Sequence, residues 1–390
     1  MRKLLLLVLL VACGDDPQHP SDAAVDAAPD SPPQPARADV LSVPASVVGQ
    51  VDLLVMVDDS PSTADKTANL KASFPALIAA LDALPGGRPD LHIGVITSDV
   101  GTKGMADAQP GPPIGGGGPS SCSGTGKAGV LQTQGSSLVT GAFLSDVATS
   151  TGRETNYTGT LADAFSAIAS VGAAGCGFEQ PLQAIQLALS PDNTANSGFL
   201  RADANLVVLV LTDEDDCSIN HSTLFASDTA TLGPLQSFRC TRFGITCDQG
   251  GSTPDEMNQV GPKSQCHSNE SGTYLTKVAD HVAFLQSLKT DPRRIMIAAL
   301  VGDPAPVATE LRAPSGGSEP VPALAHSCTY TDTLRQLEVA DPAVRIAELA
   351  NPFQHHVVQS VCSNLANGLS AIAHELATLE GSTCLTRPIA

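Results

Sequence analysis

The chain has 390 residues, with 21 Lys plus Arg against 40 Asp plus Glu, and a formal net charge of −19. Hydrophobic residues make up 42% of it, enough for a buried core, which excludes disorder along the whole chain. The acidic balance argues against nucleic acid and against anionic lipid headgroups as partners, because both require a basic surface. An acidic surface instead favours divalent cations and basic partners.

The first twelve residues have the pattern of an export signal. Arg2 and Lys3 precede the apolar run Leu4–Leu10, which is much shorter than the ~20 residues that span a bilayer. The sequence from Leu10 to Cys13 resembles the lipobox of bacterial lipoproteins, which implies cleavage before Cys13 and acylation of that residue. The alternative is an ordinary secretory signal in which Cys13 is incidental.

Residues 13–46 are expected to be a tether that follows the lipidated cysteine. The segment is rich in Pro, Ala and Asp and has no apolar periodicity, so it cannot form a core. Its prolines favour an extended, semi-rigid chain. Gly14 stands where some lipoproteins carry an Asp that retains them at the inner membrane, so the resemblance favours the outer membrane. No later segment is long and apolar enough to be transmembrane.

Residues 47–390 are expected to fold, and five apolar runs in them are predicted strands. The first four are nearly continuous, as in parallel strands covered on both faces, and the fifth alternates, which favours an edge. In chain order they are Val51–Val57, Leu91–Thr97, Asn205–Thr212, Arg294–Val301 and Val344–Ala350. Lys127–Thr133 is a candidate antiparallel edge strand beside the second run.

Segments with helical spacing separate these runs. The apolar positions from Leu70 to Leu84 fall on one helix face, with Pro75 as a kink or restart. The other predicted helices are Leu161–Val171, Gln180–Leu189, Gly272–Leu288 and Ser363–Leu379. Strands that alternate with helices predict an α/β fold with a doubly wound, mostly parallel sheet.

Polar residues follow two of these strands directly. In a doubly wound sheet the ligand site lies at the carboxyl ends of the strands. Asp58, Ser60 and Ser62 follow the first run, and Asp213 follows the third. The loop 172–179 should lie on the same face, and its hard oxygen donors suit Mg²⁺ or Ca²⁺. The alternative is that the serines cap a helix while the aspartate is a solvated strand end.

The segment VDLLVMVDDSPS resembles the opening strand of a von Willebrand factor type A domain. Asp58, Ser60 and Ser62 match the Asp-x-Ser-x-Ser motif of the family's metal-ion-dependent adhesion site, and NLVVLVLTD places Asp213 as its distal aspartate. The resemblance covers roughly residues 47–380. It implies a Rossmann-like sheet and a bound Mg²⁺ or Ca²⁺ with one open position, which a partner's carboxylate fills.

The family's further metal ligand, usually a Thr, falls on Glu179 in this chain. Three carboxylates (Asp58, Glu179 and Asp213) around one dication leave a net charge of −1. That charge weakens the attraction for an acidic ligand and favours Ca²⁺. We hypothesise that Glu179 either enters the metal shell or supplies the carboxylate that a partner would otherwise bring.

Three long insertions follow strands on the same face, at residues 101–126, 214–271 and 303–341. They have few apolar runs and are expected to be long loops. Loops of this length within a compact domain are usually functional, so they favour a recognition surface. The alternative is neutral decoration.

Nine cysteines follow Cys13, and in an exported chain they are expected to form disulfides. They are Cys122, Cys176, Cys217, Cys240, Cys247, Cys266, Cys328, Cys362 and Cys384. An odd number leaves one that is free or intermolecular. Cys122 and Cys176 lie on the same face and are a candidate pair, whereas a helix of ~25 Å separates Cys362 from Cys384. A zinc site is the alternative for the four cysteines of the second insertion, although no CxxC spacing supports it.

These observations together predict a lipid-anchored binding protein of the bacterial cell envelope, not an enzyme. The metal face would engage a protein or glycan partner. One alternative is an envelope lipoprotein of the same fold whose site holds no metal. A metal-dependent hydrolase is less favoured, because neither a general base nor a nucleophile is evident beside the carboxylates.

Overall fold

Seven strands form the central sheet, in the order β13-β8-β5-β1-β2-β3-β4. The computed structural model describes residues 49–84, 86–314, 319–331 and 335–381. Neighbouring strands are parallel from β13 to β2, while β3 is antiparallel to β2 and β4 to β3. The bounds are β1 Gln50–Val57, β2 Asp90–Thr97, β3 Leu144–Thr149, β4 Gly152–Thr155, β5 Asn205–Leu211, β8 Ile295–Val301 and β13 His355–Ser360. The sequence therefore predicted the four inner strands to within one residue at each end.

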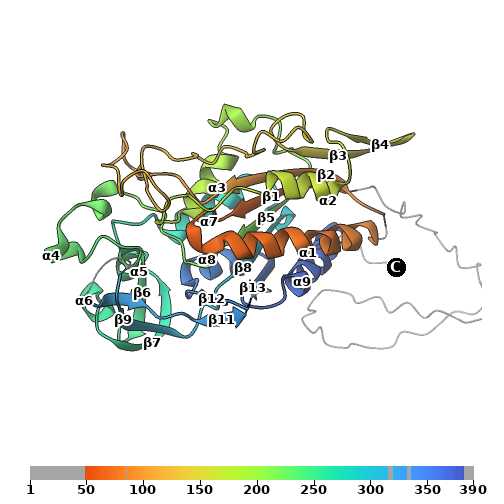
Figure 1. Ribbon diagram of the computed structural model, residues 1–390. Coiled ribbons are helices and arrows are strands. Elements are labelled where there is room, and N and C mark those ends of the chain that lie inside the picture. The colour runs from red at the N-terminus through yellow and green to blue at the C-terminus, as the bar shows by residue number, and fades with distance from the viewer. Residues whose placement is uncertain (1–48, 85, 315–318, 332–334, 382–390) are drawn as a thin grey trace, which may run out of the picture. The chain divides into compact units, whose positions relative to one another are not determined.

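Helices cover both faces of this sheet (Figure 1). One face packs against α1 (Ala64–Asp82), α2 (Leu161–Ile168) and α9 (Leu365–Gly381). The other packs against α3 (Pro181–Leu189), α7 (Val278–Ser287) and α8 (Val344–Ala350). Successive residues of β1 enter different cores, because Leu53 faces the first set of helices and Leu54 the second. Burial on both sides is why the inner strands are continuous apolar runs.

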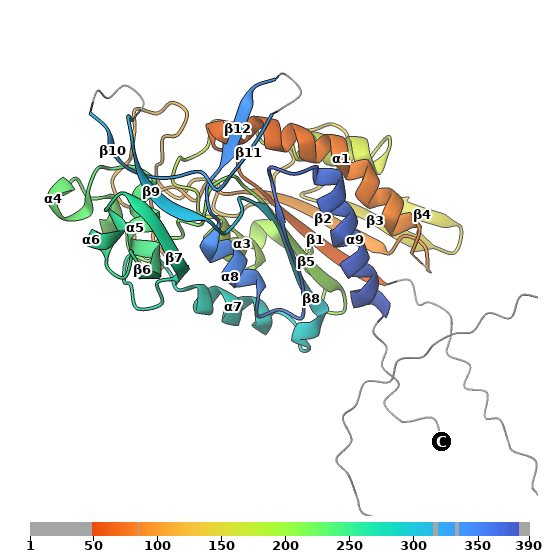
Figure 2. The ribbon, with the colours of Figure 1, turned by 90° about the horizontal axis from the view of Figure 1, so that it is seen from below.

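The second and third insertions are not the loops that the sequence predicts. They form an antiparallel sheet, in the order β10-β9-β7-β6, at the carboxyl end of the central sheet (Figure 2). Its strands are β6 Ile245–Gln249, β7 Gly261–Ser268, β9 Val307–Arg312 and β10 Val321–Leu324, with the hairpin β11 Cys328–Thr331 and β12 Leu337–Ala340 beside it. Short helices accompany them: α4 Thr229–Leu232, α5 Phe238–Gly244 and α6 Pro254–Met257. Such short, mostly polar strands leave no long apolar run to detect.

The fifth predicted strand, Val344–Ala350, is wrong, since these residues form α8. The carboxylate of Asp215 accepts the backbone N–H of Arg345 at 3.0 Å and that of Ile346 at 3.3 Å, which satisfies the start of the helix. The strand at this edge of the sheet is instead β13, which begins at His355.

The candidate edge strand Lys127–Thr133 is also wrong. It is a loop that reaches β2 through one backbone hydrogen bond, from Gln132 N–H to the carbonyl of Val95 at 2.7 Å. The antiparallel neighbour of β2 is β3. Pro75 lies inside α1 without ending it, and α7 begins at Val278, later than predicted.

The direction of the strands separates two ends of this unit. Strand β1 starts at Gln50, at the amino end of the sheet. The strands β1, β5 and β8 end side by side at the opposite, carboxyl end. We call the residues that follow β1 and β5 at this end of the sheet, 58–62 and 212–216, the crest. The expected signal, the tether with Cys13, and Cys384 lie outside the described residues.

Candidate functional site

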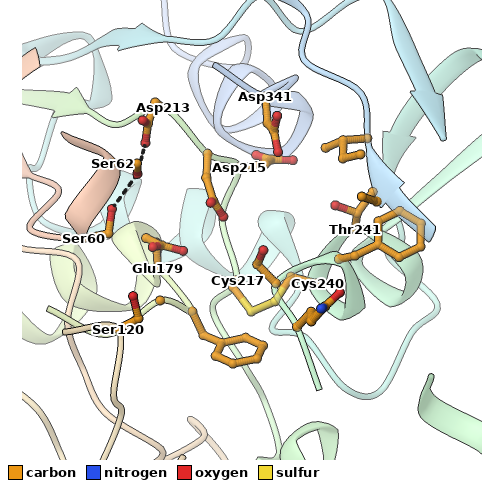
Figure 3. Close-up of a pocket in the computed structure, with 18 of the residues that line it drawn as sticks. Ser60, Ser62, Ser120, Glu179, Asp213, Asp215, Cys217, Cys240, Thr241 and Asp341 are labelled. Atoms are coloured by element: carbon orange, nitrogen blue, oxygen red, sulfur yellow. Dashed lines mark hydrogen bonds between the residues drawn. A yellow bond between two sulfur atoms is a disulfide. The ribbon is translucent and has the colours of Figure 1, made fainter. Parts of the chain in front are cut away.

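The crest brings together the polar residues that the sequence singled out. Asp58 follows β1 and its backbone N–H donates to the carbonyl of Leu211 at 3.0 Å, which locks the ends of β1 and β5 together. Asp213 follows β5 on the neighbouring strand. In Figure 3, Ser60, Ser62, Asp213 and Glu179 lie around one pocket. The strand register therefore explains why residues about 150 positions apart meet.

Asp58 organises the loop after β1 from a fully buried position. One carboxylate oxygen accepts the backbone N–H of Ser60 at 2.8 Å and the hydroxyl of Ser98 at 3.1 Å, and the other accepts the hydroxyl of Thr212 at 2.6 Å. Burial, and then the nearby charge of Asp213, raise the pKa of Asp58 to about 7. Asp58 is therefore no solvated strand end, because protein donors hold both of its oxygens.

A chain of hydroxyls links the two strand ends. Ser60 Oγ lies 3.0 Å from Ser62 Oγ, and Ser62 donates to Asp213 Oδ1 at 3.1 Å (Figure 3). Neither serine side chain caps the turn or helix that follows, so the capping alternative is wrong. The hydroxyl that holds this turn is that of Thr63, which donates to the carbonyls of Asp58 and Ser60.

Lys66 supplies an internal positive charge that the sequence did not reveal. Its ammonium lies 3.0 Å from Asp213 Oδ2 and 3.1 Å from Asp65, and it donates to the carbonyl of Ser62 at 2.9 Å. The side chain is only 1% exposed. Burial would lower the pKa of Lys66, but the carboxylate of Asp213 outweighs that effect and raises it. The two oxygens of Asp213 therefore face different groups, Oδ1 a hydroxyl and Oδ2 an ammonium.

Glu179 and Glu214 form a second group of carboxyls in the same pocket. The side chain of Glu179 points into it from the loop before α3 (Figure 3), and the residue is 2% exposed. Burial, and then the charges of Glu214 and Asp58, raise the pKa of Glu179 well above its usual range. Burial, and then the charges of Asp341 and Asp213, raise the pKa of Glu214 well above its usual range as well. The sequence named Glu179 but gave Glu214 no role.

The next two acids of the run after β5 are structural. Asp215 accepts the first backbone N–H groups of α8, and burial raises its pKa to about 7. Asp216 pairs with Arg345 at 3.1 Å, and both side chains are at most 1% exposed. These two carboxylates tie the crest to α8, so their charges already have partners.

A cavity of about 620 Å³ lies between the crest and the two large insertions. Its floor is the polar crest, and its apolar wall includes Phe178, Leu235, Phe238 and Leu324. The disulfide Cys122–Cys176 holds the first insertion to the loop before α3, and Cys217–Cys240 holds α5 beside the crest. All three insertions contribute to its lining.

The cysteines within the described residues form four disulfides. Cys122–Cys176 confirms the predicted pair, and Cys217–Cys240 and Cys247–Cys266 show that the zinc alternative is wrong. Cys362 pairs with Cys328. Among the nine cysteines after Cys13, this leaves Cys384, which lies outside the described part of the chain.

The acidic side chains of this pocket are not arranged so that they could coordinate a metal ion by themselves. Within the described ranges, no group of three or more His, Cys, Asp or Glu side chains is placed so that it could hold a metal ion. A cation at the crest would therefore have to draw on the serine hydroxyls. Nor does any described helix combine the length and the apolar character that crossing a membrane requires.

Comparisons with known proteins give no family for this chain. No protein-family model matches it, and no curated protein matches its sequence. The PilB minor pilin from Streptococcus sanguinis is similar in structure, with 9% identity, a TM-score of 0.33, and coverage of 88% of this chain and 65% of the pilin. A point mutant of that pilin gives 8% identity, a TM-score of 0.33 and coverage of 87% and 63%.

The pilus adhesin RrgA from Streptococcus pneumoniae is more distant, with 10% identity, a TM-score of 0.22, and coverage of 84% of this chain and 44% of the adhesin. The chain thus spans less than two thirds of the length of these proteins. The von Willebrand factor type A assignment drawn from the Asp-x-Ser-x-Ser motif is wrong. No family model supports it, and the described residues lack a group of His, Cys, Asp or Glu side chains that could hold a metal ion.

Proposed function

We propose that this protein is a binding protein of the cell envelope that holds a divalent cation at the crest and presents the adjoining cavity to a partner. The observation that supports the cation is the spacing of three oxygens. Ser60 Oγ and Ser62 Oγ are 3.0 Å apart, and Ser62 Oγ and Asp213 Oδ1 are 3.1 Å apart. In an octahedral shell with bonds of about 2.1 Å, adjacent ligand oxygens lie about 3 Å apart.

The charges at the crest favour the same ligand. The carboxyl groups of Asp58, Glu179, Asp213 and Glu214 lie close enough to interact with one another. The ammonium of Lys66 pairs with Asp213, and it also contacts Asp65 and Glu338. Burial raises the pKa of all four carboxyl groups, and repulsion among them adds to the rise for Asp58, Glu179 and Glu214. A divalent cation would favour their charged forms. Because Lys66 holds only Oδ2 of Asp213, Oδ1 can serve the cation beside Ser62.

The serines support binding better than catalysis. A serine nucleophile needs a neighbouring base that takes its proton. The acceptor of the hydrogen bond from the Ser62 hydroxyl is the carboxylate of Asp213. Burial raises the pKa of Asp213, but the ammonium of Lys66, 3.0 Å from its other oxygen, favours the charged form and so opposes its taking up a proton. We therefore propose a protein without enzymatic activity, with a protein or glycan as its partner.

The export signal and the lipobox at Cys13 complete the proposal, with the outer membrane as the favoured location. Strand β1 begins at the amino end of the sheet, and the cavity lies beyond the carboxyl ends of the strands. A chain anchored through Cys13 would thus enter the unit at the end opposite to its binding face.

Calorimetric titration of Ca²⁺ and Mg²⁺ into the full chain tests this proposal. We expect saturable binding that weakens at least about tenfold in Ser62→Ala and in Asp213→Asn. Asp255→Asn is the matched control, since its side chain is 92% exposed and lies away from the crest, and it should bind as the wild type does. Absence of binding, or equal affinity in all four proteins, would refute the cation.

A further inference from the structure

The cavity is larger than one cation requires, and its two sides differ in character. At about 620 Å³ it falls within the range of ligand pockets, which are mostly apolar with a few polar groups that fix orientation. Phe178, Phe238 and Leu324 give it an apolar wall. The acids of the crest form the other side (Figure 3). An occupant should therefore combine apolar surface with a polar tip.

Most charges that line the cavity already have partners. Asp215 accepts the N–H groups of α8, and Asp216 pairs with Arg345. Asp341 pairs with His326 at 2.6 Å. Among the basic residues that line the cavity, Arg312 pairs with Glu310 at 2.8 Å and donates to the carbonyl of Leu324. These pairs leave Asp215, Asp216, Asp341 and Arg312 with little uncompensated charge for an incoming group.

The Glu179–Glu214 pair differs from the rest. Glu179 is only 2% exposed and points into the cavity, which Glu214 also lines. Burial and the repulsion of neighbouring carboxylates raise the pKa of both carboxyl groups, and a cation bound between them would favour their charged forms. They also match the fork of a guanidinium, which bonds carboxylates through two parallel N–H groups.

We propose that the cavity receives an arginine side chain of a protein partner, with its guanidinium on Glu179 and Glu214 and its stem along the apolar wall. This inference builds on the proposed binding function and names the chemistry of its partner. It also agrees with the charge at the crest. Glu179, Asp213 and Glu214 line the cavity with carboxyl groups, beside which a guanidinium would add positive charge.

The test titrates three peptides into the full chain, with and without Ca²⁺. The probes are N-acetyl-Ala-Arg-Ala-amide, the same peptide with the uncharged isostere citrulline, and N-acetyl-Ala-Glu-Ala-amide. We expect the arginine peptide to bind at least about tenfold more tightly than either of the others. Glu179→Gln and Glu214→Gln should each weaken it to a similar degree, while the exposed Glu154→Gln leaves it unchanged.

The peptide series on the wild-type chain decides the inference even if a variant fails to fold. Equal binding of arginine and citrulline, or tighter binding of the acidic peptide, would overturn it. Binding of the arginine peptide by a chain that takes up no Ca²⁺ would support the inference while refuting the cation. Uptake of Ca²⁺ without peptide binding would do the reverse.

Discussion

Single buried charges in this molecule are stable because each has partners close by. Arg239 is 1% exposed, and its guanidinium donates to the carbonyls of four residues, Leu224, Ala226, Gly233 and Pro234. Such a network offsets the desolvation of a buried cation. His281 is different, because it is 1% exposed and neither ring nitrogen has a hydrogen-bond partner among the described residues. Burial without such partners therefore disfavours the charged form of this ring.

His281 should make the fold sensitive to mild acid. Burial lowers its pKa from 6.5 to about 4, against the opposing charge of Asp216. The unfolded chain protonates this residue below about pH 6.5 and the folded chain only near pH 4, so the contribution of His281 to stability falls as the pH drops through this window. The loss is at most about 1.4 kcal/mol per pH unit. Denaturant unfolding of His281→Leu between about pH 7 and pH 5 should show a smaller loss than the wild type.

His374→Gln is the control for this experiment, because His374 is an exposed residue on α9. It should keep the pH dependence of the wild type. If His281→Leu loses stability with acid as steeply as the wild type, His281 is not the group that responds.

At the residue scale, the positions of side chains directly after predicted strands were enough to identify part of the site. Asp58 and Asp213 could be found because each directly follows a continuous apolar run, and neighbouring strand ends must meet. Lys66 could not be found, because its ammonium turns back from the first turns of α1 to reach Asp213, a contact that depends on the folded geometry. Glu214 was not given a role, since its partner Glu179 comes from a distant loop.

The same physics decides which elements could be predicted. The inner strands carry a strong signal because both of their faces are buried, whereas β6, β7 and β9 leave many of their residues partly or fully exposed. In a run of only seven residues such as Val344–Ala350, periodicity does not distinguish a strand from a helix. What decides its structure is the tertiary contact with Asp215 at its start.

Helix α8 should therefore depend on this single carboxylate. We expect Asp215→Ala to destabilise the fold by about 1–2 kcal/mol, because the first N–H groups of a buried helix lose their acceptors. Asp215→Asn keeps one acceptor oxygen and should cost less. Thermal unfolding measures both.

Asp228→Ala is the matched control, since Asp228 caps the short surface helix α4 by accepting from Ala230 and Thr231 at 3.1 and 3.2 Å. Loss of this cap should have a smaller effect on global unfolding, because an exposed four-residue helix can fray alone. Equal effects of the two alanine variants would contradict a special role for Asp215.

At the scale of the whole molecule, the excess of acid is the dominant electrostatic fact. A net charge of −19 adds self-repulsion to the compact state, and dissolved salt screens it. The crest adds a local concentration of the same sign, which screening reaches poorly because the groups are buried. General salt and a site-bound cation should therefore stabilise the chain in two separable ways.

We expect NaCl, raised from about 10 mM to about 150 mM, to increase the melting temperature of the full chain by a few degrees, since the Debye length shrinks to about 8 Å. MgCl₂ or CaCl₂ at the same ionic strength should add a further increase, because a ligand that binds only the folded state stabilises it. The Asp213→Asn variant should keep the response to NaCl and lose the further increase, since the removed charge belongs to the crest. A melting temperature that falls with NaCl would contradict the role of self-repulsion. If NaCl and the divalent salts raise the melting temperature of the wild type equally at the same ionic strength, the divalent ions act by screening the surface charge and do not bind at the crest.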